Sequence, residues 1–83
     1  MSRDQIRARL AAFICKEALK DPSYPLSDEE PLLSGGLISS FYLVQIAMFA
    51  EKELGVHIPD ADLTVEKMDT LAQMVDRIMQ EMS

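Results

Sequence analysis

Apolar residues near the start of the chain recur every three or four positions, the spacing of one face of an α-helix. This pattern predicts a first helix over residues 3–19. The apolar positions that form the stripe are Ile6, Leu10, Phe13 and Ile14. Pro22 and Pro25 follow closely, and a proline lacks the backbone N–H that a continuing helix needs. We therefore expect the helix to end before residue 21.

A long connection, residues 21–38, precedes the next helical pattern. It is longer than most loops of compact domains, and we expect its apolar residues to pin it to the core. These residues are Leu26, Leu32, Leu33, Leu37 and Ile38. A second helix is predicted from Ser39 or Ser40 to Leu54, because Gly55 provides a common type of helix stop.

The second helix should have two different faces, since each residue turns the helix by about 100°. The face expected to pack inward carries Leu43, Ile46, Ala47, Ala50 and Leu54. The opposite, outward stripe carries Phe41, Gln45, Met48 and Lys52. Phe41 and Met48 are large apolar residues for an exposed position. Either they mark an interface, or they pack under the long loop.

The last part of the chain predicts a short and a long helix. Residues 61–67 favour one or two helical turns, and residues 70–82 a longer helix. Thr70 and Gln73 have the spacing of a capping box, in which two side chains satisfy the first free amides of a helix. No segment alternates as a strand would. We predict one all-α domain over residues 1–83, a small four-helix bundle with a short third helix.

Charge and cysteine content narrow the possible functions. The net charge is −6, which argues against a nucleic-acid partner, since phosphates require a positive surface. The basic residues are concentrated in residues 1–20, and the rest of the chain is strongly acidic. Cys15 is the single cysteine, so no internal disulfide forms. It falls on the side of the first helix opposite Ile6 and Leu10, and we therefore expect a partly exposed thiol. No segment approaches the ~20 apolar residues that span a bilayer, and no apolar signal core is present. We expect a cytoplasmic protein without membrane insertion.

Three kinds of chemical site can be weighed against the sequence. Ser40 and His57 would lie at opposite ends of the second helix, about 20 Å apart, which argues against a nucleophile and base pair. The segment Ser34–Gly36 lacks the Gly-Lys-Ser/Thr of a phosphate-binding loop. The run Asp28–Glu30 lacks the ligand spacing of a calcium loop and is expected to be solvated, and His57 is expected in a solvated link. We predict no enzyme activity and no metal site.

The adjacent serines Ser39 and Ser40 are the remaining candidate. One serine is explained as an N-cap, because its side chain can accept from the free amides of the first turn. A second hydroxyl, facing outward there, lies in a field that favours an attached phosphate. Attachment of a phosphodiester-linked group and simple capping both remain open from the residues alone.

The segment "GGLISSFYLVQIAMFAEKELGVHIPDADLT", with the later "MDTLAQMVDRI", resembles the acyl carrier protein family. The order of helices, long loop and "LGVHIP" link is similar along nearly the whole chain. In the family an Asp-Ser-Leu motif opens the second helix, and its serine carries 4′-phosphopantetheine. The resemblance implies attachment at Ser40, with Ser39 less favoured. It also implies a phosphopantetheinyl transferase that uses coenzyme A, and acyl-loading and acyl-processing enzymes, as partners of a monomer.

Two departures from the family are visible. Ser39 stands where the family has Asp, and it could keep the capping role but not the charge. Phe41 replaces the leucine. Family members that serve fatty-acid synthesis carry an acidic outward stripe on the second helix, whereas Phe41, Gln45, Met48 and Lys52 are apolar, neutral or basic.

The resemblance therefore implies a carrier of acyl or aminoacyl thioesters in a specialised lipid or secondary-metabolite pathway. Small residues of the second helix and flexible methionines of the last could leave room inside for a short acyl chain, or could be ordinary packing. They are Ala47, Ala50, Met74 and Met79. The alternative functions are a carrier-like interaction module that is never modified, which the missing aspartate favours, and an acidic adaptor of unrelated origin.

Overall fold

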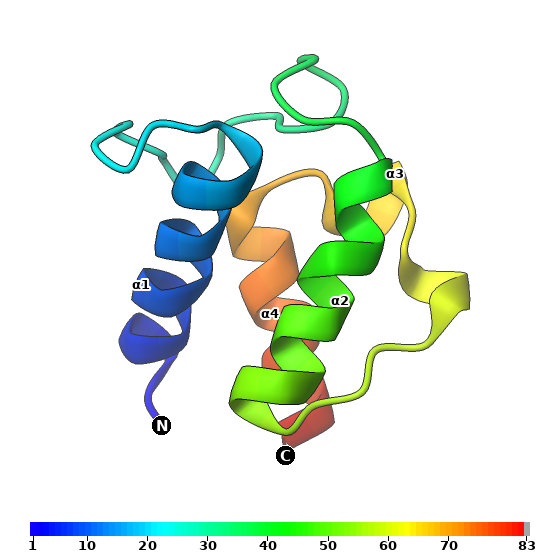
Figure 1. Cartoon of the computed structure of the whole chain (residues 1–83). Coiled ribbons are helices and arrows are strands. Elements are labelled where there is room, and N and C mark those ends of the chain that lie inside the picture. Colours follow the sequence, from blue (N-terminus) through cyan, green and yellow to red (C-terminus); the bar gives the residue numbers. More distant parts are fainter. Residues whose placement is uncertain (83) are drawn as a thin grey trace.

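A computed structural model describes residues 1–82 and contains helices and loops but no strand in that range. The helices are α1 (Arg3–Phe13), α2 (Phe41–Leu54), α3 (Val65–Met68) and α4 (Leu71–Met82). In Figure 1, α2 and α4 run in the same direction and α1 runs opposite to both. The predicted all-α bundle of three longer helices and a short third one is confirmed.

α1 begins at a capping box that the sequence reading missed. Ser2 accepts a hydrogen bond from the Gln5 backbone N–H at 3.2 Å, and the Gln5 side chain accepts from the Ser2 N–H at 2.9 Å. Beyond Phe13 the helix continues as a π-helical turn, Ile14–Ala18. The predicted end of the helix is thus confirmed, although its last turn is wider than an α-helical one.

The expectation of a partly exposed Cys15 is wrong, because the side chain is 4% exposed. The chain after the π-turn folds back over this side of the helix. The Asp21 N–H donates to the Cys15 carbonyl at 2.8 Å, and the Cys15 Sγ donates to the Tyr24 carbonyl at 3.5 Å. Burial, with a smaller contribution from the negative charge of Asp21, raises the pKa of the thiol. The loop, which helical spacing does not describe, is what covers Cys15.

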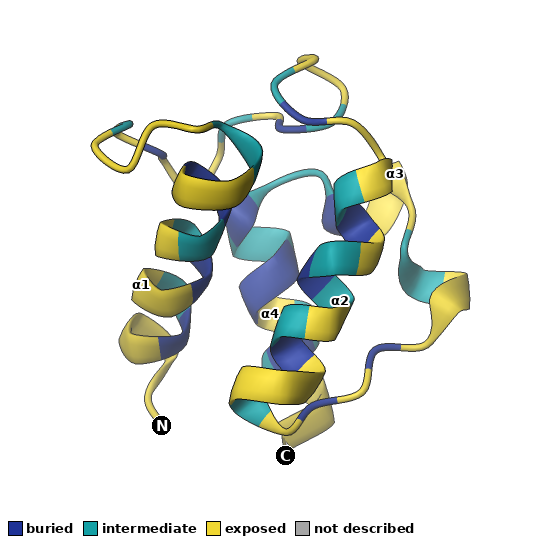
Figure 2. Ribbon diagram, viewed as in Figure 1, coloured by how far each residue is buried: buried dark blue, intermediate teal, exposed yellow. Residues whose placement is uncertain are grey.

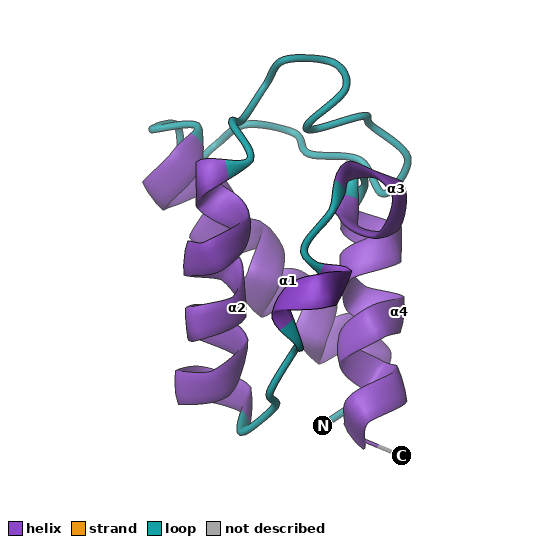
Figure 3. Cartoon of the chain, turned by 90° about the vertical axis from the view of Figure 1, so that its right-hand side faces the viewer, coloured by secondary structure: helices purple, strands orange, loops and turns teal. Residues whose placement is uncertain are grey.

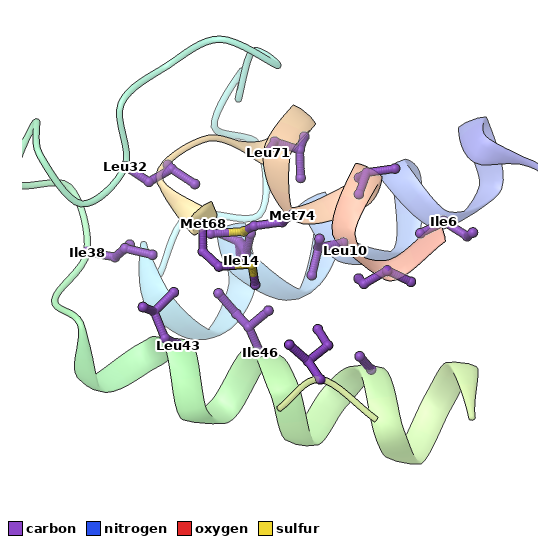
Figure 4. Packing of buried hydrophobic residues seen from close by; sticks show 14 of the residues in the cluster. Ile6, Leu10, Ile14, Leu32, Ile38, Leu43, Ile46, Met68, Leu71 and Met74 are labelled. Atoms are coloured by element: carbon purple, nitrogen blue, oxygen red, sulfur yellow. The ribbon is translucent and has the colours of Figure 1, made fainter. Parts of the chain in front are cut away.

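The core lies between α1, α2 and α4 and is closed at one end by the long loop (Figures 2 and 4). Every buried side chain in residues 1–82 is apolar or, at Cys15, a thiol. Most of the apolar positions predicted to face inward on the three long helices are buried, but Phe13, Ala47 and Leu54 are only partly buried, and Met82 at the end of α4 is exposed. Ala50 and Met74 are fully buried, whereas Ala47 and Met79 are partly buried.

The loop between the first two helices arches over the ends of α1, α2 and α4 (Figure 3). Leu26, Leu32 and Ile38 are buried, and Leu33 and Leu37 pack against the core, so the predicted pinning is confirmed. These contacts fix the path of the chain into α2.

The acidic run in this loop is more than a solvated segment, which corrects the expectation. Asp28 pairs with Arg7 of α1, and its carbonyl accepts from the Ala72 N–H of α4 at 3.1 Å. Glu30 accepts from the Tyr24 hydroxyl at 2.6 Å. Only Glu29 of the three is exposed. The run therefore attaches the loop to two helices.

Candidate functional site

Ser40 lies at the point where the long loop enters α2, and it is exposed. Its backbone is already helical, with φ −61° and ψ −18°, and its carbonyl accepts from the Leu43 N–H at 3.0 Å. Within residues 1–82, its hydroxyl makes no hydrogen bond. The structure thus presents an accessible alcohol at the positive end of a helix of 14 residues.

Neither serine caps α2 with its side chain, which corrects the expected role of Ser39. The residue that precedes the helix is Ser40, and it makes no side-chain cap. Ser39 is exposed, and only its carbonyl takes part in the turn, accepting from the Tyr42 N–H at 3.0 Å. Ser40 has a helical backbone, whereas a residue that caps a helix with its side chain usually has an extended one. The other end of α2 agrees with prediction: Gly55 is left-handed, with φ 68°.

Asp69, between α3 and α4, holds the loop that leads to Ser40. Its Oδ1 accepts from the Leu33 N–H at 2.8 Å and the Ser34 N–H at 2.9 Å, and its Oδ2 accepts from the Ser34 hydroxyl at 2.6 Å. Its carbonyl accepts from the Leu32 N–H at 2.7 Å. The Ser34 hydroxyl, followed by the Ser34 and Leu33 amides, lowers the pKa of this carboxyl. Sequence reasoning missed this contact, which joins residues 35 positions apart.

We call the hydrogen bonds that residues 32–34 donate to Asp69 the Asp69 clamp. They adjoin the capping box predicted at the start of α4. The Gln73 N–H donates to Thr70 Oγ1 at 3.1 Å, and Gln73 Oε1 accepts from the Thr70 N–H at 3.0 Å, which confirms the box. The same Oε1 accepts from the Asp69 N–H at 2.9 Å. One glutamine therefore fixes both the start of α4 and the backbone of the residue that holds the loop.

An apolar ridge runs along the outer side of α2. It consists of Phe41, Val44 and Met48, which are 66%, 53% and 63% exposed. The alternative that Phe41 and Met48 pack under the loop is therefore wrong. Of the other residues predicted for this stripe, Gln45 is half-buried and Lys52 is exposed. Val44 was missed, although it lies only about 60° around the helix from Phe41.

The ridge forms one wall of a shallow groove between α1 and α2. The groove is lined by the ridge, Gln45, Phe13, Phe49 and the charged residues Glu51, Lys52 and Glu53. The rings of Phe13 and Phe49 lie 4.6 Å apart and join the two helices. Phe13 was expected in the core stripe, but it is only partly buried and contributes to this surface.

His57 is exposed in the link after α2, as predicted. Its Nδ1 lies 3.6 Å from a carboxylate oxygen of Glu51. It belongs to the end of α2 opposite Ser40, so the two side chains are not brought together. Within residues 1–82, no cluster of potential metal ligands is found. In the same range, no helix is long and apolar enough to cross a membrane.

No model of a known protein family matches this chain, and a search among curated proteins finds no significant match. The site is therefore defined by its geometry. It combines a free hydroxyl at the head of α2, a loop fixed by Asp69, and an exposed apolar ridge beginning at the next residue.

Proposed function

We propose that this protein is an acyl carrier that holds acyl or aminoacyl intermediates of a specialised lipid or secondary-metabolite pathway on Ser40. The observation that carries the proposal is the exposed Ser40 hydroxyl, unbonded within residues 1–82, at the N-terminus of α2. The small all-α bundle, with a long first loop and a one-turn third helix, is consistent with the fold that the resemblance implies and supports the proposal. In this proposal the protein catalyses nothing itself and works as a cytoplasmic monomer.

The residues present fit a 4′-phosphopantetheine group. The phosphodiester would be attached at the exposed Ser40 oxygen, in the favourable field of the first turn of α2. A phosphopantetheinyl transferase would join the Ser40 oxygen to the phosphorus that carries pantetheine in coenzyme A, with adenosine bisphosphate as the leaving group and the serine proton passing to the transferase. When bound, the group supplies a terminal thiol that holds the cargo as a thioester.

The rest of the chain would position this serine. Asp69 fixes residues 32–34 of the loop, and the buried Ile38 anchors the chain two residues before Ser40. The Ser39 side chain makes no cap within residues 1–82, so the replacement of the family's aspartate removes no hydrogen bond that Ser39 makes here. The loss of the negative charge would bear on how a transferase recognises the site.

Partner enzymes would dock on the outer side of α2. Phe41 and Met48 offer exposed apolar contact area, with Gln45 and Lys52 beside them. Apolar residues exposed together in this way commonly mark an interface. A carrier for fatty-acid synthesis would offer carboxylates on this side of α2. The apolar and uncharged surface found here therefore supports partner enzymes that belong to a specialised pathway.

Intact mass after co-expression with a broad-specificity transferase tests the proposal. The wild-type protein should gain the mass of one phosphopantetheine group, and Ser40→Ala should gain none. Ser39→Ala is the matched control and should still be modified. Helical circular dichroism should be unchanged in both variants, because neither hydroxyl caps α2.

An unmodified wild-type protein, with transferase activity shown on another carrier, would refute the carrier function. That result would favour the second candidate, an unmodified interaction module. The exposed apolar ridge supports such a module as well, since it needs a partner and no attached group.

A further inference from the structure

The apolar ridge is aligned with the proposed attachment residue. Ser40, Val44 and Met48 follow one another at intervals of four residues, and residues with this spacing are neighbours on one side of a helix. The ridge therefore leads away from the Ser40 hydroxyl down α2, from the end where the loop enters the helix (Figure 1). Ser40 and Met48 are separated by about 12 Å along the helix axis, from eight residues at 1.5 Å each.

The surface beside this line is a groove whose apolar part has a definite end. Phe13 and Phe49 line it on the side of α1, where their rings lie 4.6 Å apart. The next residue in the four-residue series, Lys52, is charged and lies between Glu51 and Glu53. The apolar run thus begins beside Ser40 and stops after Met48, about two helical turns later.

We propose that this groove holds the apolar part of an acyl group tethered through Ser40. The inference rests on the proposed carrier function and adds to it the place and chemical class of the cargo. The phosphopantetheine arm is flexible and, when extended, reaches beyond Met48, so it can fold back and lay its acyl group along the groove; a group tethered in this way has an effective concentration of roughly millimolar near its anchor. A site with a dissociation constant of about 1 mM would then be half-occupied, so a shallow apolar groove suffices.

The interior of the bundle offers less room for such a group. Leu43, Ile46 and Ala50 on the inner face of α2 are no more than 2% exposed, and Met74 opposite them is fully buried. Close-packed cores accept added volume only by displacing side chains. The groove needs no such displacement. Because partners are proposed to dock on the same ridge, docking would lift the acyl group off the surface at delivery.

Methyl NMR on the modified protein tests the location. The transferase loads Ser40 from octanoyl-coenzyme A or, as the short-chain comparison, from acetyl-coenzyme A. We expect the octanoyl group to shift the Val44 and Met48 methyl signals at least twofold more than the acetyl group does. Val44→Lys should remove the octanoyl-specific shift at Met48. Val65→Lys, at an exposed position of α3 outside the groove, is the matched control and should retain it.

Three results would overturn the proposal. Octanoyl-specific shifts at the core residues Leu43 and Ile46, with none at the ridge, would place the chain inside the bundle. Equal shifts for octanoyl and acetyl groups would show that the groove does not hold the chain. Ridge shifts that vanish on dilution would show that a second copy of the protein covers the ridge.

A chemical tether separates this proposal from the carrier function. In Ser40→Cys, a thiosulfonate that carries an octyl or a methyl group on a linker as long as the phosphopantetheine arm can react with the exposed thiol, forming a disulfide and releasing a sulfinate without any transferase, while the buried Cys15 stays unmodified. Octyl-specific shifts at Val44 and Met48, with no enzymatic modification of the wild-type protein, would support the groove and refute the carrier function. Enzymatic modification with no octyl-specific shift would support the carrier function and refute the groove.

Discussion

The Asp69 carboxylate accepts two hydrogen bonds from Ser34, one from its backbone N–H at 2.9 Å and one from its hydroxyl at 2.6 Å. These bonds tie the loop before α2 to the junction of α3 and α4. They exist in this form only while the carboxyl is ionised, and accordingly the pKa of Asp69 is lowered. The path of the loop into the candidate site is therefore linked to pH.

The first prediction concerns this linkage. A group whose pKa is lower in the folded than in the unfolded state stabilises the fold above its unfolded pKa, and this contribution is lost as pH falls through the folded pKa. For Asp69 the loss should begin near pH 4, the value for an unfolded aspartate. Asp69→Asn should lower the free energy of unfolding at pH 7 and flatten its decline below pH 4, as measured by urea denaturation.

Asp62 provides the comparison for this experiment. Its pKa is lowered mainly by hydrogen bonds from Lys67 and Arg77, whereas Leu33 and Ser34 bond to Asp69. Asp62→Asn should also flatten the acid profile but leave the amide signals of Leu33 and Ser34 unchanged. If Asp69→Asn left those two signals unchanged as well, the clamp would be refuted.

The second prediction separates serine and threonine residues that cap a helix from those that do not. Thr70→Ala removes the side-chain acceptor of the Gln73 N–H and should cost about 1 kcal/mol of unfolding free energy. Ser2→Ala removes the corresponding acceptor for Gln5 in α1 and should have an effect of similar size.

Ser39→Ala is the contrasting substitution. It should change stability by less than about 0.5 kcal/mol, the usual range for a surface change, because the Ser39 side chain makes no hydrogen bond within residues 1–82. Urea denaturation of the three variants measures these differences. A loss of about 1 kcal/mol in Ser39→Ala would show that this residue caps α2 in solution.

Local periodicity was enough to predict most of the fold. The two long helices after the loop, the left-handed Gly55 and the Thr70–Gln73 capping box all depend on residues close together in the sequence. The exposed stripe of α2 was predicted for the same reason. Val44 was missed because assigning residues to two opposite faces leaves out those that lie between them.

The errors concern contacts between distant segments or departures from ideal geometry. Cys15 is buried because the chain returns over the π-turn, as its bond to the Tyr24 carbonyl shows, and helical spacing carries no information on that return. The Asp69 clamp joins residues that no local pattern connects. The sequence predicted Ser39 as a capping residue. In the structure the helix is preceded by Ser40, whose backbone is helical, and neither serine side chain makes a capping hydrogen bond.

The third prediction concerns Cys15 itself. Its thiol is buried and its pKa is raised, and the thiolate is the form that reacts with disulfide reagents. At pH 8 the native protein should react with such a reagent much more slowly than the protein in urea, where one thiol should react at once. Equal rates would show that the segment around Tyr24 does not cover the thiol.

The last prediction concerns how partners recognise α2. The ridge of Phe41, Val44 and Met48 carries no charge, so binding to a fatty-acid ketosynthase should be weak and should change little with salt, since electrostatic steering contributes little there. Met48→Glu places a carboxylate at the end of the ridge that is farther from Ser40. It should strengthen binding at low salt and make it salt-sensitive, whereas Val65→Glu on α3 should not. Calorimetry at several salt concentrations measures the affinity of the wild-type protein and of the two variants. Strong and steeply salt-dependent binding of the wild-type protein would argue for a general fatty-acid carrier instead of a specialised one.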